Sequence, residues 1–153
     1  MLLHFLFEWT GESVFVAPFS AVNESIWEHM KLLYFPMFLF ALVENRYLKH
    51  DGFWCTKLFG IALGTALIPI LYNTINGIFG PMSDWVNIAI FFVSAAAAFV
   101  TETKRLSANS MNCTCSGAAL IILCLIALLF AVLTFIPPHI PLFQDPITGG
   151  YGI

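Results

Sequence analysis

Long runs of apolar residues are the feature that most constrains the fold of this chain. Leu58 to Phe79 contains no charged residue, and Gly117 to Pro137 is built mainly of Leu, Ile and Ala. A hydrocarbon core about 30 Å thick requires roughly 20 apolar residues in helical form. Within that core every backbone N–H and C=O group needs an internal partner, which a helix supplies. Both runs are therefore predicted to be transmembrane helices.

Two further runs complete a prediction of four spans. Residues 84–103 begin with Asp84, an acid favoured at the positive end of a helix. Residues 26–47 have a shorter uncharged centre, with Lys31 and Arg46 near the ends, where long side chains can reach the headgroups. The spans at 26–47, 58–79, 84–103 and 117–137, with a tail at 138–153, predict an all-α integral membrane helical bundle and a single domain over 1–153.

Composition supports this class and excludes another. Hydrophobic residues make up 59% of the chain and charged residues 10%, against the roughly 25% charged residues of soluble domains. The net charge is −3, and the six Lys and Arg residues form no basic patch. The lipid bilayer is therefore the expected partner, and nucleic acid is not.

The basic residues also predict an orientation in the cell membrane. Lys31 lies on one side, and five basic residues lie in or near the loops on the other: Arg46, Lys49, Lys57, Lys104 and Arg105. The positive-inside rule places those loops in the cytosol and residues 23–29, the 80–84 turn and the tail outside. This topology places the N-terminus outside, although no cleavable signal peptide is recognised that would carry it across the membrane. We expect either an interfacial segment before the first span or a further helix upstream, ending at Leu2 to Phe7.

Two sequence motifs resemble those of a known protein family. They are Asn-Glu-Ser-x-Trp-Glu-His-x-Lys, from Asn23 to Lys31, and Pro-Leu-Phe-x-Asp-Pro-x-Thr-Gly-x-Tyr-Gly, from Pro141 to Gly152. With His4 and Glu8-Trp9 upstream, they resemble a family of small, uncharacterised bacterial multi-pass membrane proteins. The resemblance covers the whole chain and implies the membrane fold. It implies no catalytic or binding residue.

The first motif places unusual charge at the start of a membrane helix. In helical geometry Glu24, Glu28 and Lys31 share one face, and Ser25 and His29 share another. One interpretation is structural, because the carboxylates suit the helix N-terminus and pair with Lys31. Another is that they line a polar pocket as ion ligands or proton-transfer groups. Contact with lipid headgroups is a third.

Polar residues of other segments are expected at similar depth. Amides within a membrane need partners, which they find either between helices or in such a pocket. The tail, whose Asp-Pro-x-Thr-Gly-Gly stretch predicts a turn, could fold back as a lid. The full candidate pocket comprises Asn23, Glu24, Glu28, His29, Lys31, Asn73, Asn76, Asp84, Asn87, His139 and Asp145.

The same carboxylate and imidazole side chains could also support metal binding or catalysis. Carboxylates and imidazoles can bind a metal ion, but no His-Glu-x-x-His pair is present, and no cofactor is predicted. Acid–base hydrolysis by Glu28 and His29 remains an alternative. The four cysteines, with Cys55, Cys113 and Cys115 on the side expected to be cytosolic, are expected to be free thiols.

Small residues predict close helix packing. Gly60 and Gly64 share a face of the second span, and Ser94 to Ala98 make the third span slim. These contacts are expected either inside the chain or in a homo-oligomer. Three functional classes follow: a protein with an outward polar pocket that binds or transports an ion, headgroup or small polar ligand, a structural or accessory subunit, and a membrane-embedded hydrolase.

Overall fold

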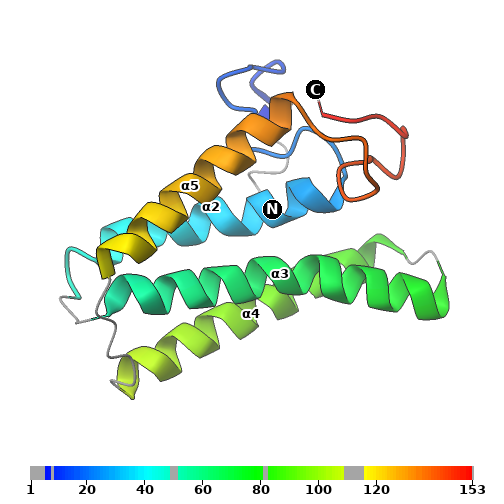
Figure 1. Cartoon of the computed structure of the whole chain (residues 1–153). Helices are drawn as coiled ribbons and strands as arrows, with labels where there is room; N and C mark the ends of the chain where they lie inside the picture. The colour runs from blue at the N-terminus through cyan, green and yellow to red at the C-terminus, as the bar shows by residue number, and fades with distance from the viewer. Residues whose placement is uncertain (1–5, 8, 49–51, 81–82, 109–115, 153) are drawn as a thin grey trace.

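Four long helices form the body of the protein (Figure 1). The computed structural model describes residues 6–7, 9–48, 52–80, 83–108 and 116–152. The helices are α2 (Ile26–Glu44), α3 (Phe53–Phe79), α4 (Asp84–Ser107) and α5 (Ser116–Phe135). All four are long and apolar enough to cross a membrane, and the described residues pair as strands only in an isolated bridge between Gln144 and Tyr151. The predicted all-α class with four candidate spans is confirmed.

The helix boundaries differ from the expected ones mainly near the charged residues. α2 ends at Glu44, three residues before the expected end, whereas α3 begins at Phe53, five residues before Leu58. α4 continues to Ser107, four residues beyond the expected end at 103. Lys57 can lie inside α3, and Glu102 inside α4, because the two side chains pair within the bundle.

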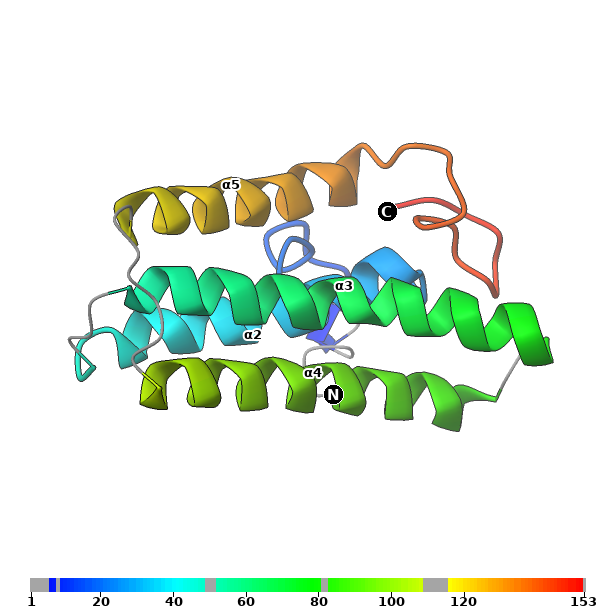
Figure 2. The same cartoon turned by 60° about the horizontal axis from the view of Figure 1, so that its bottom comes forward.

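α3 is the central helix. It packs along α4, α2 and α5, and Figure 2 shows α4 and α5 on opposite sides of it. A Cβ atom added to Gly64 would lie 2.8 Å from Ala98 Cβ and 3.1 Å from the Ser94 carbonyl oxygen, both on α4. The small residues therefore bring α3 and α4 together within one chain. The homo-oligomer expected through Gly60 and Gly64 or the Ser94 to Ala98 face stays a prediction.

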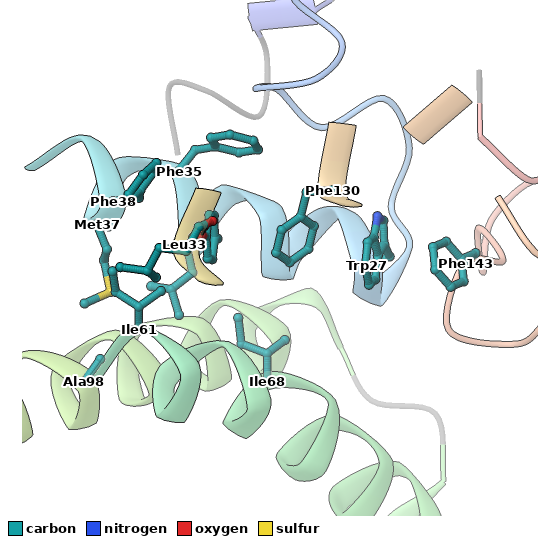
Figure 3. Close-up of a cluster of buried hydrophobic side chains, with 12 residues drawn as sticks. Trp27, Leu33, Phe35, Met37, Phe38, Ile61, Ile68, Ala98, Phe130 and Phe143 are labelled. Atoms are coloured by element: carbon teal, nitrogen blue, oxygen red, sulfur yellow. Dashed lines mark hydrogen bonds between the residues drawn. The ribbon is translucent and has the colours of Figure 1, made fainter. Parts of the chain in front are cut away.

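The aromatic core lies between α2, α5 and the tail (Figure 3). The Trp27 ring lies between the rings of Phe130 on α5 and Phe143 in the tail, with centroids 4.5 Å away on each side. One to two turns further along α2, the Tyr34 hydroxyl donates a hydrogen bond of 2.5 Å to the Leu123 carbonyl of α5. These contacts hold α5 and the tail against α2.

The tail folds back over the start of α2. The Trp27 backbone N–H donates to the Leu142 carbonyl at 3.1 Å, and Asn23 Nδ2 donates to the Gly152 carbonyl at 3.1 Å. We call this end of the bundle, where α3 ends and α4 begins, the tail end. The opposite end, where α2 ends and α3 begins, is the loop end (Figure 1).

Candidate functional site

The carboxylate of Glu28 and the ammonium of Lys31 form a buried ion pair at the tail end. Glu28 Oε2 and Lys31 Nζ are 2.5 Å apart, and the two side chains are 2% and 0% exposed. Residues three apart share a helix face, so α2 itself aligns the pair. We call this contact the tail-end ion pair.

Lys31 also joins three parts of the chain. Its Nζ donates to the Ala17 carbonyl at 2.8 Å and to Thr134 Oγ1 of α5 at 3.0 Å, in addition to Glu28. An ammonium group has three N–H donors, so three acceptors satisfy it completely. The tail-end ion pair therefore fastens the segment before α2, and α5, to α2.

The local sequence explains why α2 begins where it does. Ser25 is the N-cap, and its hydroxyl accepts from the Glu28 backbone N–H at 3.4 Å. Asn23 Oδ1 accepts from the Ser25 backbone N–H at 3.0 Å, a turn that precedes the cap. Glu28 Oε2 accepts from the Val22 backbone N–H at 3.0 Å. Asn23 and Glu28 thus order the chain entering α2.

Glu24 and His29 occupy a more open position on the same helix end. His29 Nε2 lies 3.8 Å from Glu24 Oε2, with side chains 25% and 40% exposed. His29 Nδ1 lies 2.9 Å from the Ser25 carbonyl, which can only accept, so this nitrogen carries a hydrogen in that contact. Of the first motif's charged groups, these two reach the surface.

The predicted pocket residues of α3 and α4 lie toward the tail end, where α3 ends and α4 begins. Asn73 is exposed, and its Nδ2 donates to the Pro69 carbonyl of its own helix at 2.8 Å. Asn76 and Asn87 are partly buried, and Asn87 Oδ1 has no hydrogen-bond partner. The side chain of Asp84 lies outside the described part of the structure. Asn73 is therefore directed to its own helix rather than to Glu28.

In the tail, Asp145 organises its own turn. Its carboxylate accepts from the Ile147 backbone N–H at 2.9 Å and from Thr148 Oγ1 at 2.6 Å. The ring of exposed His139 contacts that of Tyr151, with centroids 4.7 Å apart and the ring planes inclined by 58°. The expected turn after Asp145 is present, and the tail does fold back, through Leu142, Phe143 and Gly152.

A second group of buried charges lies at the loop end, where the sequence predicts helix ends and a loop. Lys57 Nζ of α3 is 2.5 Å from Glu44 Oε2 of α2 and 2.7 Å from Glu102 Oε2 of α4. The side chains of Lys57, Glu44 and Glu102 are 3%, 20% and 2% exposed. We call these three residues the loop-end cluster.

Helical spacing in the sequence provides a signal for this cluster. Lys57, Gly60 and Gly64 recur at helical spacing, which places the lysine on the face expected to pack closely. A Cβ atom added to Gly60 would lie 2.2 Å from Glu102 Cγ. The glycine therefore makes room for the glutamate of α4.

Two predictions concern metals and thiols. Among the described residues, no group of three His, Cys, Asp or Glu side chains is placed to hold a metal ion. Cys55, at the loop end, is disulfide-bonded to a partner outside the described residues, so the prediction of a free thiol is wrong for Cys55. Cys124 is free and exposed, whereas Cys113 and Cys115 lie outside the described residues.

Comparison with known proteins gives a family but no activity. No curated protein and no solved structure matches the chain significantly. A family model described as a family of unknown function, DUF6512, matches residues 1–153. Because this match spans the whole chain, the protein belongs to the DUF6512 family of unknown function.

Proposed function

We propose that the protein is a structural or accessory component of the cell membrane, in which the tail-end ion pair holds the fold together. The observation that carries the proposal is the environment of Lys31, whose three donors meet acceptors from three segments at 0% exposure. A ligand site needs groups left free to bind, and neither Lys31 nor Glu28 is accessible. The bilayer is the proposed partner, and the tail end is proposed to face outward.

The membrane-embedded hydrolase has less support. Glu28, its expected acid or base, is 2% exposed and is engaged by Lys31 and Val22. A general base must reach the proton that it removes, directly or through a water molecule. The Ser25 hydroxyl is likewise occupied as the cap of α2.

A polar binding site for an ion or headgroup is a second candidate, restricted to the two partly exposed residues of the first motif, Glu24 and His29. Glu24 and His29 reach the surface at the start of α2, where the headgroup region lies if α2 spans the bilayer. An imidazole and a carboxylate at that level suit a zwitterionic headgroup, which offers both charges. This candidate places any ligand outside the tail-end ion pair rather than on it.

Thermal unfolding with added ligands distinguishes these functions. A ligand that binds the folded state raises the melting temperature. The purified protein in a non-ionic detergent would be heated with sodium, potassium, magnesium, inorganic phosphate or short-chain phosphatidylcholine. The structural proposal expects no shift with any of them. A shift removed by the double variant Glu24→Gln and His29→Gln would establish the headgroup or ion site, and a shift removed by Glu28→Gln would refute the proposal for the tail-end ion pair.

A further inference from the structure

The loop-end cluster carries more negative than positive charge inside the bundle. With all three residues ionised, Glu44 and Glu102 contribute two negative charges and Lys57 one positive charge. An uncompensated charge in an apolar helical bundle is costly unless it is paired, hydrated or neutralised. The composition of the cluster therefore requires one more positive charge, or one fewer negative charge.

One carboxylate oxygen in the cluster, Glu102 Oε1, has neither a hydrogen bond nor an ion pair with another described residue. Glu102 Oε2 accepts from Lys57, whereas Glu102 Oε1 is buried and has no hydrogen-bond partner. A Cβ atom added to Gly60 would lie only 2.6 Å from Oε1, so this oxygen faces the backbone of α3 closely. A proton on Oε1 needs far less space there than a metal ion with its shell of oxygen ligands.

No other described cation is placed to neutralise Glu102. The described basic residues nearby are Arg46, in the turn after α2, and Lys104 on α4, which are both exposed. Arg105 on α4 has its guanidinium 3.7 Å from the Phe59 ring centroid. The described part of α5 contains no charged residue. Lys57 Nζ itself lies 5.5 Å from the Phe53 ring centroid and 5.9 Å from that of Phe40. Residues 49–51 are outside the described residues.

We propose that the loop-end cluster is a proton-binding site, with Glu102 protonated on Oε1 at neutral pH while Lys57 and Glu44 form the ion pair. The protonated cluster is then neutral overall, and Glu102 Oε2 still accepts from the Lys57 ammonium. Glu44 is the ionised carboxylate because it is the more exposed of the two. The site joins α2, α3 and α4, so loss of its proton places a net negative charge between three helices. This inference is independent of the role of the tail-end ion pair.

Infrared spectroscopy tests this site directly, because a buried protonated carboxyl has a C=O stretch distinct from that of carboxylates. The full chain would be measured at neutral pH in a detergent without carbonyl groups. We expect a carboxylic-acid band in the wild type and its retention in Glu28→Gln. The band should be lost completely in Glu102→Gln, and also in Glu44→Gln, because Glu102 then ionises as the single counterion of Lys57. Absence of the band in the wild type, its survival in Glu102→Gln, or its loss in Glu28→Gln would overturn the proposal.

The test does not depend on the folding of one variant. Gln has the shape of a protonated Glu, so Glu102→Gln is expected to keep the melting temperature of the wild type. If Glu102→Gln is not recovered, glutamate labelled with ¹³C at the side-chain carboxyl assigns the band in the wild type. A band that shifts with this label, persists in Glu28→Gln and disappears in Glu44→Gln supports the site, and a band that does not shift refutes it.

Discussion

Replacing Lys31 by Met should destabilise the protein far more than removing a lysine from its surface. The variant leaves the carboxylate of Glu28, 2% exposed, without its ammonium partner at 2.5 Å. Removing one member of a buried ion pair costs about 3–5 kcal/mol, because the remaining charge stays buried and unpaired. The Ala17 carbonyl and Thr134 Oγ1 lose a donor in the same change. We therefore expect the free energy of unfolding to fall by about 3–5 kcal/mol.

The assay is reversible unfolding in mixed detergent micelles, followed by tryptophan fluorescence. The matched control is Lys104→Met, whose side chain is exposed and whose cost should stay within about 0.5 kcal/mol. The double variant Glu28→Gln with Lys31→Met should cost less than the two single variants added together, by about 0.5–3 kcal/mol. A Lys31→Met cost equal to that of the control, or a strictly additive double variant, would refute the proposed coupling.

Three further predictions concern packing and orientation. Gly60→Ala should lower the free energy of unfolding by about 1–3 kcal/mol, because its Cβ would meet Glu102 Cγ at 2.2 Å. Its control is Gly77→Ala, whose Cβ would have no atom within 4 Å and which should be neutral or stabilising. Equal effects of the two variants would contradict this packing. Phe143→Ala should lower the free energy of unfolding by about 3–5 kcal/mol, because it removes a ring that packs on Trp27. Ile147→Ala should have little effect, because Ile147 is 78% exposed. A small effect of Phe143→Ala would show that the tail is not part of the core. With the tail end outside, a membrane-impermeant maleimide should label Ile147→Cys in intact cells and Leu48→Cys only after permeabilisation, and the reverse pattern would show the opposite orientation.

The labelling experiment also decides between two opposed indications. The distribution of Lys and Arg predicts a cytosolic loop end. The disulfide at Cys55 favours an oxidising compartment for that same end, because stable disulfides are rare in the cytosol. We retain the orientation given by the basic residues as a proposal, since Arg46 and Lys104 are exposed on that side.

The fold class was predictable because its signal is local. Each span can be recognised from its own run of apolar residues, and Ser25 before Glu28 predicts the start of α2 through the spacing of a helix cap. The pairing of Glu28 with Lys31 was also within reach, since residues three apart on a helix share a face. The structure adds the depth of burial: the pair expected at the start of the helix is an internal contact, with both side chains buried.

The partners between segments were not predictable in the same way. Lys31 meets Ala17 and Thr134, 14 and 103 residues away, and a helical pattern says nothing about which helices are neighbours. The same limit applies to Glu44 and Glu102, which lie near the ends of two different helices. Their role depends on Lys57 reaching both from α3, a contact fixed only by three-helix packing.

Amine modification followed by mass spectrometry tests most directly whether the first motif is an internal structural element. A small water-soluble acylating reagent would be applied to the folded protein, and the rates of modification of Lys31 and Lys104 would be compared. We expect Lys104, which is exposed, to react readily and Lys31, at 0% exposure with three acceptors around it, to react only after unfolding. Modification of Lys31 in the folded protein at the rate of Lys104 would contradict a structural role and support an accessible polar site.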